Sequence, residues 1–255
     1  MLLTIDIGNT NITLGIYNGD KLNFVSRIAT EREKTADQYA IELRNIFHIY
    51  NISKLDIDGS IISSVVPELS TSLKKAMILL TGKAPMIVGP GIKTGLDIRI
   101  DNPSQLGADL AVGAVAALAK YDLPCIIFDL GTATTISVLG KNGEFLGGSI
   151  SAGVGVSLNA LTDRTSMLPK ISIETPKKAI GKNTIESMQS GLILGAAAML
   201  DGLTKRMEDE IGAKATLVAT GGLAPEIIKN CEREIIFDDN LLLDGLKIIY
   251  DKNKK

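Results

Sequence analysis

Two stretches that lie far apart in this sequence follow one pattern. TIDIGNTNITLGIYNGDKL (residues 4–22) and IFDLGTATTISVLGKNGEFL (residues 127–146) each run from apolar residues into Asp, Gly and small polar residues. Each then enters a second apolar run that ends at Asn-Gly. Asn-Gly between two apolar runs is a strong signal for a β-hairpin. Because the pattern occurs once in each half, the chain is predicted to be a duplicated domain.

Helix and strand patterns alternate after each hairpin. In the first half, the hydrophobic periodicity predicts strands at 2–8, 11–17, 21–30, 59–66 and 84–89, and helices at 35–50 and 68–81. After a loop and a helix at 108–120, it predicts strands at 124–131, 134–140, 144–151 and 215–222, and helices at 154–162, 184–210 and 240–253. This order indicates an α/β protein with two similar halves, residues 1–112 and 113–255. We expect a cleft between them, into which both Asp-Gly turns point.

Composition narrows the class of protein and its partners. Hydrophobic residues make up 45% of the chain and charged residues 22%, as in globular proteins. The net charge is only -2 and the basic residues are scattered, so neither nucleic acid nor a membrane is an expected partner. Cys125 and Cys231 fit neither a disulfide framework nor a zinc site, which suggests core thiols in a cytoplasmic protein. His48 lies in a predicted helix, where a structural role is expected.

The first Asp-Gly turn has the residue types of a phosphate-binding loop. Gly8 keeps a Cβ out of the way, so backbone N–H groups can approach phosphate oxygens, and amide and hydroxyl side chains follow it. Asp6 cannot bind phosphate favourably by itself. It fits through a cation such as Mg²⁺, which proteins hold with one or two carboxylates together with substrate phosphates.

The second turn, Asp129 to Thr135, supplies the same elements with hydroxyls in place of amides. Either turn alone is equally well explained as a tight hairpin with a capping Asp. Two copies at matching positions favour phosphate binding. The sequence contains no Walker motif, and GVGVSLNA (residues 153–160) lacks the third glycine of a dinucleotide fingerprint, so it is weak support for that fold.

Two further motifs are candidates for the site. Gly107 precedes Asp109 at the start of a predicted helix, where the helix dipole is expected to keep the carboxylate ionised. The alternative is that Asp109 only caps that helix. The stretch ATGG (residues 219–222) follows a predicted strand. It is either a flat platform for a base such as adenine or a structural turn.

Taken in order, these motifs resemble the type III pantothenate kinases. The resemblance rests on DIGNTN (6–11), KTGLDIRIDNP (93–103), GAD (107–109), DLGTATT (129–135), GGSISAG (147–153), GKNTIESMQSG (181–191), ATGG (219–222) and NLLLDGL (240–246). It implies two duplicated RNase H-like domains, as in the acetate-kinase and actin superfamily. It also implies phosphorylation of pantothenate by ATP with Mg²⁺, the first step towards coenzyme A, by a homodimer.

The resemblance also implies roles for individual residues. Asp109 would be the general base, and Asp129 would bind a monovalent cation, K⁺ or NH4⁺. The residues implied to bind ATP are Asp6, Ile7, Gly8, Asn9, Thr10, Asn11, Ile12, Thr13 and Thr132. Those implied to bind pantothenate are Ile100, Gly107, Ala108, Asp109, Leu110 and Thr184.

Two positions depart from the family pattern, which usually has Arg at position 110 and often Tyr at position 100. Leu110 cannot donate the forked hydrogen bonds that Arg gives to a carboxylate or phosphate. One interpretation is a working kinase with weaker pantothenate binding, or one in which Arg99 or Arg164 supplies the lost contact. Another is a nucleotide-binding paralogue with a regulatory role or a different acceptor. A third, a sugar kinase or polyphosphate-cleaving relative, should lack the surroundings of Asp109 and Thr184.

Overall fold

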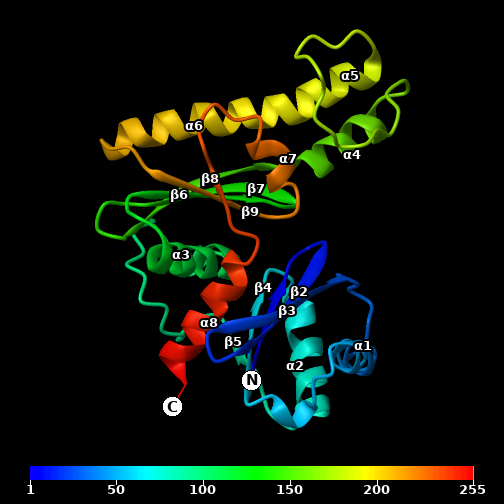
Figure 1. The fold of residues 1–255 in the computed structure, drawn as a ribbon, viewed down its shortest axis with the longest axis vertical. Coiled ribbons are helices and arrows are strands. Elements are labelled where there is room, and N and C mark those ends of the chain that lie inside the picture. The colour runs from blue at the N-terminus through cyan, green and yellow to red at the C-terminus, as the bar shows by residue number, and fades with distance from the viewer. Residues whose placement is uncertain (255) are drawn as a thin grey trace. The chain divides into compact units, whose positions relative to one another are not determined.

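The computed structural model describes residues 1–254, which form two compact units (Figure 1). The first unit contains residues 1–95, residues 102–116 and helix α8 (Leu241–Asn253), and the second contains residues 96–101 and 117–240. These units differ from the expected halves, 1–112 and 113–255, chiefly because α8 returns to the first unit. In that unit, the Tyr17 hydroxyl donates a 2.6 Å hydrogen bond to the Asp244 carboxylate of α8.

The first unit is built on one five-stranded sheet. Its order is β3 (Lys21–Ala29), β2 (Asn11–Asn18), β1 (Leu2–Ile7), β4 (Gly59–Ser64) and β5 (Met86–Ile87). The central strand β1 pairs antiparallel with β2 and parallel with β4. The predicted hairpin turn at Asn18-Gly19 is confirmed, with Gly19 at a positive φ of 59°.

The second unit repeats this topology. Its sheet order is β8 (Phe145–Ala152), β7 (Ala133–Leu139), β6 (Cys125–Leu130), β9 (Thr216–Thr220) and β10 (Ile236–Phe237). Here β6 pairs antiparallel with β7 and parallel with β9, as β1 does with its own neighbours. The predicted duplication is therefore confirmed strand by strand, including the turn at Gly143 with φ 85°.

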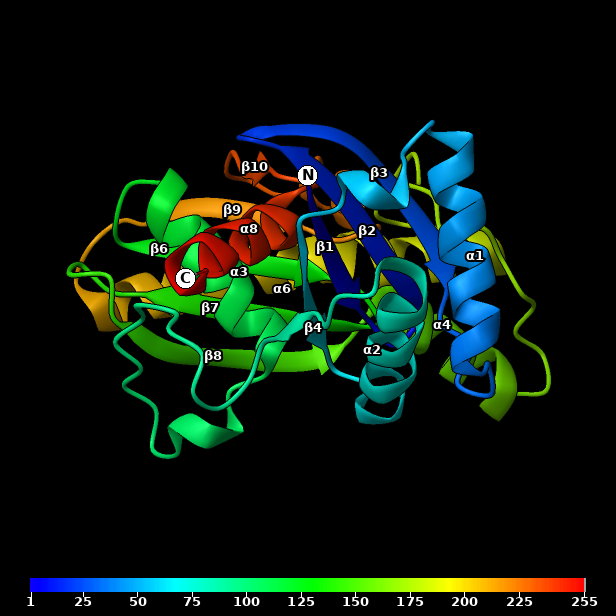
Figure 2. The same ribbon diagram turned by 90° about the horizontal axis from the view of Figure 1, so that it is seen from below.

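Helices α1 (Ala36–Ile49) and α2 (Pro67–Thr81) lie side by side over one face of the first sheet (Figure 2). Their buried side chains form one core cluster with Leu3, Ile5 and Leu14 of the strands. A capping box between Thr35 and Gln38 begins α1. Short 3₁₀ helices occupy Lys54–Asp56 and Pro103–Gln105, and α3 (Ala108–Lys120) begins in this unit.

The second sheet is covered by α4 (Val154–Arg164), α5 (Thr184–Gln189), α6 (Gly195–Ile211) and α7 (Ala224–Ile228). The helix predicted at 184–210 is present as a continuous helical stretch but contains a π-helical turn, Ser190–Leu194. Such turns are frequent at functional sites. Helix α7 was not predicted, because its five residues show too little hydrophobic periodicity.

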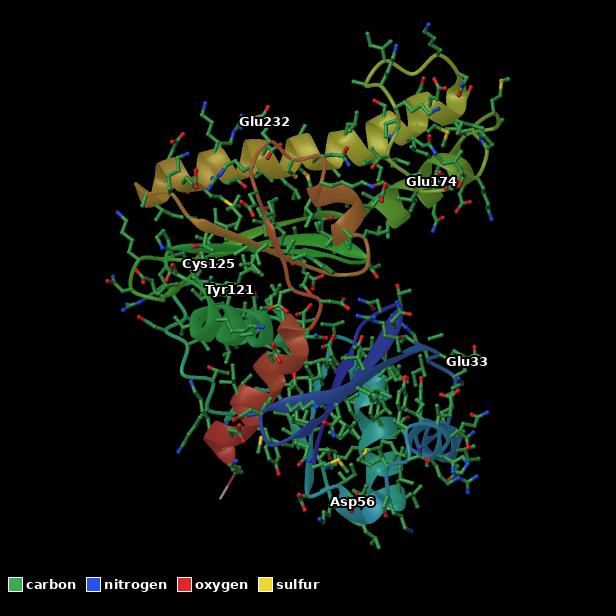
Figure 3. The ribbon with its side chains drawn as sticks, in the orientation of Figure 1. Glu33, Asp56, Tyr121, Cys125, Glu174 and Glu232 are labelled. Carbon is green, nitrogen blue, oxygen red and sulfur yellow. The ribbon has the colours of Figure 1, made fainter. Side chains whose placement is uncertain are left out.

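The two cysteines lie in or against the core of the second unit, whereas His48 lies at the surface of the first. Cys125 is fully buried at the start of β6 (Figure 3), and Cys231 packs against the core of the same unit. Burial raises the pKa of both thiols to about 12, so both are inert core residues. His48 is exposed on α1.

Across residues 1–254, no helix has the length and apolar character needed to cross a bilayer.

Candidate functional site

The two aspartates of the repeated motif occupy equivalent positions. Asp6 is the penultimate residue of β1 and faces Thr13 across the hairpin, while Asp129 is the penultimate residue of β6 and faces Thr135. Each turn is closed by the N–H of its glycine. Gly8 donates to Asn11 O over 3.0 Å, and Gly131 donates to Ala133 O over 3.1 Å. One turn of this kind therefore ends the central strand of each sheet.

The first turn contains both buried apolar residues and exposed polar residues. Ile7 and Ile12 are fully buried in the core, so their side chains cannot contact a ligand. Asn9, Thr10 and Asn11 are exposed. A ligand at this turn would therefore meet backbone amides and small polar side chains, which is the chemistry of a phosphate site.

Arg32 and Thr30 form hydrogen bonds to this turn, and no role was predicted for either from the sequence. The Arg32 guanidinium donates to Asn9 Oδ1 over 3.1 Å, and the Thr30 hydroxyl donates to Gly8 O over 2.7 Å. They reach the turn because the end of β3 pairs with the start of β2, Ala29 opposite Asn11. Arg32 thus places a positive charge beside a turn suited to anions.

The second turn is supported by Gly153, the first glycine of GVGVSLNA. Gly153 N donates to Thr132 O over 3.1 Å. A Cβ at position 153 would lie 2.5 Å from that oxygen and would also overlap Gly131 O. The GVGVSLNA motif, which was weak support for a dinucleotide fold, therefore has a structural role. Its first glycine packs closely against the backbone of the second turn and fixes the loop that carries Thr132.

Beside each aspartate lies a buried hydroxyl that has no hydrogen-bond partner among residues 1–254. These are Ser63 Oγ, on the strand position paired with Asp6, and Thr135 Oγ1, on the position paired with Asp129. Paired residues of neighbouring strands point to the same sheet face. A carboxylate next to an unsatisfied hydroxyl oxygen is a donor set suited to a cation or to the water around one.

Asp109 lies inside the first turn of α3, after Gly107 and Ala108, so it is not at the N-cap position. Its Oδ1 accepts from Leu110 N over 2.8 Å, and a Cβ at Gly107 would lie 2.5 Å from the same oxygen. Backbone N–H groups lower the pKa of Asp109, as the helix N-terminus was expected to do. Burial outweighs them, and the pKa is raised. A carboxylate with a raised pKa is a better proton acceptor.

The residues expected to bind pantothenate belong to both units. Gly107, Ala108, Asp109 and Leu110 lie at the start of α3 in the first unit, whereas Ile100 and Thr184 lie in the second. Ile100 follows a segment that pairs with β8. Arg99 N donates to Phe145 O over 2.8 Å, and Ile100 Cγ2 would lie 3.6 Å from a Cβ at Gly147.

Thr184 opens onto a cavity of about 700 Å³ that lies wholly in the second unit. It is lined by Leu161, Leu168, Gly181, Lys182, Asn183, Thr184, Ser187, Met188, Gly191 and Leu192. Lys182 is the only charged residue in this lining, and its ammonium group makes no hydrogen bond or ion pair within residues 1–254. The cavity therefore combines one cation and two hydroxyls with an apolar wall. The GKNT motif predicted Thr184 as a site residue, but it did not predict a role for Lys182.

The GKNT turn is tightly constrained. Asn183 caps α5 by accepting from Glu186 N over 2.9 Å, and Glu186 in turn accepts from Lys182 N over 2.9 Å. A Cβ at Gly181 would lie 2.7 Å from Glu186 C, so only glycine lets this turn pack against α5. These contacts fix Thr184 at the first position of the helix.

Of the two arginines considered as replacements for the family's Arg, Arg99 is already engaged. Its guanidinium pairs with Asp97 over 2.8 Å at the surface. Arg164, one turn beyond the cavity residue Leu161, is exposed and has no ion-pair partner in residues 1–254.

The turn after β9 is structural at Gly221. Its φ is 98°, and a Cβ there would lie 2.7 Å from the backbone of Leu130.

Comparisons with known proteins agree with these motifs. The family model for type III pantothenate kinase matches residues 2–206. A type III pantothenate kinase from an Exiguobacterium species is 46% identical over 255 residues and covers 100% of both chains. A structure from Campylobacter jejuni, named as a Baf family transcriptional activator, has a TM-score of 0.62 at 18% identity over 98% of each chain. An ADPNP-bound dehydratase activator from Clostridium difficile has a TM-score of 0.54 at 14% identity, covering 100% of this chain and 98% of its own.

The two solved structures show a shared fold only, which agrees with the duplicated α/β architecture predicted from the sequence. The family model matches residues 2–206, a range that spans the motifs quoted above from residue 6 to residue 191, and the curated relative matches over the whole chain. This chain belongs to the type III pantothenate kinase family.

Proposed function

We propose that this protein transfers the γ-phosphoryl group of ATP to the primary hydroxyl of pantothenate, forming 4'-phosphopantothenate in the first step of coenzyme A biosynthesis. The family match and the cavity beside Thr184, the one expected pantothenate residue in its lining, together carry the proposal. The cavity's single cation, Lys182, suits the carboxylate of pantothenate, its hydroxyls suit the amide and alcohol groups, and its apolar wall suits the methyl groups. Family membership supports the same reaction.

ATP is assigned to the two equivalent turns. Residues 6–13, chiefly through the exposed Asn9, Thr10 and Asn11, and the exposed Thr132 would bind phosphate oxygens, with Arg32 adding positive charge. Asp6 and Ser63 would hold Mg²⁺ through its water shell, since Mg²⁺ keeps several waters and takes few carboxylates. When bound, Mg²⁺ neutralises phosphate charge, and these residues position the nucleotide.

Asp109 is assigned as the general base that accepts the proton of the attacking hydroxyl. Its raised pKa brings it closer to the pH at which the enzyme works, which increases the efficiency of a base. Gly107 leaves the space that its carboxylate occupies. The capping alternative is less well supported, because Asp109 lies past the N-cap position.

The monovalent cation is assigned to Asp129 together with the unsatisfied Thr135 hydroxyl. We expect K⁺ or NH4⁺ to give faster turnover than Na⁺ at equal ionic strength, and Asp129→Asn to remove the difference. Steady-state rates in the three chloride salts measure this. Equal rates in all three for the unmodified enzyme would contradict the assignment.

Leu110→Arg should lower the KM for pantothenate about tenfold, because a charge-assisted hydrogen bond contributes roughly 1.5–3 kcal/mol. Leu110→Met, which keeps the volume without adding a donor, is the matched control and should leave KM unchanged. The comparison uses initial rates at saturating ATP. If Arg raises KM or leaves it unaltered, the acceptor site has been rebuilt around Leu110.

We propose that this chain works as a homodimer, as its resemblance to the family implies. Met167, Ile180 and Ile185 are 90%, 82% and 49% exposed near the cavity of the second unit. Large apolar side chains in such numbers favour a covering partner. The regulatory alternative is less supported, because the protein named as a transcriptional activator shares only the fold.

ADP release measured with ATP, Mg²⁺ and K⁺, with and without pantothenate, tests the reaction. Release that depends on pantothenate is the expected result, and mass spectrometry of the product should show one added phosphoryl group. If ATP binds but pantothenate has no effect on ADP release, the nucleotide site is retained and the acceptor is a different molecule.

A further inference from the structure

The segment that joins α4 to α5, residues 165–183, has no helix or strand of its own, yet it forms part of the cavity wall through Leu168 and residues 181–183. Loops of this length in a compact domain are usually functional. Their geometry must be held by side-chain contacts, since no backbone ladder fixes it. The ties that hold this segment therefore determine the shape of the cavity.

The middle of the segment is held by a carboxylate on α7. Thr175 donates twice to Glu226 Oε1, from its backbone N over 2.7 Å and from its hydroxyl over 2.6 Å. Asn230 reinforces the tie by donating to Thr175 Oγ1 over 3.0 Å and to Glu226 O over 2.9 Å. Figure 3 labels Glu174, the residue before Thr175, in this segment.

The residue that anchors the segment is itself rigidly placed. Ala224 and Ile227, on either side of Glu226, are 0% and 1% exposed in the core of the second unit. The turn before α7 is fixed against β6 by the close approach of Gly221 to Leu130. Glu226 therefore presents its carboxylate from a helix that packs into the core, whereas residues 165–183 belong to no helix or strand.

Two further hydrogen bonds hold the segment on either side of Thr175. Ser190 in the π-helical turn donates to Ala179 O over 2.6 Å, and Gln189 donates to Ser172 O over 3.3 Å. Removing the Glu226 carboxylate would leave these bonds in place and free the stretch around Thr175. The expected effect is local loosening rather than unfolding.

The Glu226 carboxylate stays charged in all ordinary conditions. Its ion pair with Lys229 and its bonds from Thr175 lower its pKa from 4.5 to about 2. Its stabilising contribution is therefore present above pH 4.5 and is lost as the pH falls towards 2. The Lys229 ion pair is the largest cause of the lowered pKa, but because Lys229 is half exposed, solvent screens its contribution to stability. The two bonds from Thr175 are therefore the ones expected to hold the segment.

We propose that Glu226 is a positioning residue that sets the affinity for the acceptor by clamping residues 165–183 beside the Thr184 cavity, without touching substrate. This rests on the acceptor binding in that cavity, as proposed above. Nothing in the tie involves the nucleotide turns at Asp6 or Asp129. Loss of the tie should therefore weaken acceptor binding and leave ATP binding unchanged.

The kinetic test compares Glu226→Ala with Glu226→Gln. Glu226→Ala should raise the KM for pantothenate about tenfold while the KM for ATP and the Tm change little, since bonds to a charged group are among the stronger ones. Glu226→Gln keeps an acceptor oxygen for Thr175 and should restore most of the affinity. Lys229→Met, which removes only the ion pair, is the control and should resemble the unmodified enzyme.

Limited trypsin digestion tests the clamp without relying on activity. Residues 165–183 contain Lys170, Lys177, Lys178 and Lys182, so cleavage there should be several times faster in Glu226→Ala and near normal in Glu226→Gln. Should Glu226→Ala fold poorly, Thr175→Val removes the hydroxyl bond alone and should show the same changes to a smaller degree.

The two readouts separate failure of the clamp from failure of the proposed reaction. Faster cleavage in Glu226→Ala, with no pantothenate-dependent ADP release in any variant, would retain the clamp and reject pantothenate as the acceptor. Unchanged cleavage and unchanged pantothenate KM in a folded Glu226→Ala would overturn the clamp. An equal rise in the KM values for ATP and pantothenate would overturn it too.

Discussion

Asp109→Asn is expected to lower kcat by about 10²–10⁴ while the protein remains folded, because a positioned general base contributes a factor of that size. Asn keeps the shape of the side chain and one oxygen for the N–H of Leu110, which the Asp109 carboxylate accepts at 2.8 Å. The group that accepts the proton is removed. The loss should therefore fall on kcat and leave ATP affinity unchanged.

Stability provides a second readout for the same variant. Because burial raises the folded-state pKa of Asp109, its favourable contribution to folding is present below pH 3.8 and is lost as the pH rises through the folded pKa. At neutral pH the ionised carboxylate is therefore a cost. Asp109→Asn should have a Tm equal to or above that of the unmodified enzyme, which excludes unfolding as the reason for lost activity.

Asp37→Asn is the matched control, since Asp37 also lies in the first turn of a helix of the first unit but is exposed. Its turnover should be unaffected. In the unmodified enzyme, kcat/KM should fall at acid pH with a midpoint above 3.8, as the raised pKa requires. Near-normal turnover by Asp109→Asn would show that the residue supports the helix and is not the base.

Local patterns were sufficient to predict both turns and every strand of the two sheets except β10 (Ile236–Phe237). The Asn18-Gly19 and Asn142-Gly143 pairs identify the hairpins, and the apolar runs before Asp6 and Asp129 identify the central strands. These signals are short-range, because a hairpin and its turn are contiguous in the chain. The duplication followed from them without information about long-range contacts.

Features that depend on distant parts of the chain were not predictable in this way. The return of α8 to the first unit, the pairing of Arg32 with Asn9 and the cavity around Lys182 all require knowledge of which segments meet in space. The raised pKa of Asp109 was missed for the same reason. The helix dipole can be predicted from the sequence, whereas the burial that outweighs it cannot.

Gly153→Ala is expected to disrupt the second turn. The added methyl carbon would overlap Gly131 O and lie 2.5 Å from Thr132 O, both backbone atoms that cannot move without moving the turn. Overpacking of this kind costs about 1–3 kcal/mol in the free energy of unfolding. A displacement of Thr132 by about 1 Å should also lower kcat/KM for ATP by about 10²-fold. Urea unfolding and initial rates at varied ATP measure the two effects.

Gly155→Ala, two residues further along α4, is the matched control. Nothing lies within 4 Å of a Cβ at position 155, and its backbone is helical. Alanine there should stabilise the protein by about 0.5–1 kcal/mol, because glycine is the poorer helix former, and should leave the ATP kinetics unchanged. A pair of variants with opposite effects on stability would assign the loss at Gly153 to the contact with the Thr132 turn. If both variants keep normal ATP kinetics, the turn tolerates displacement, and Thr132 cannot be positioned by Gly153 for binding phosphate.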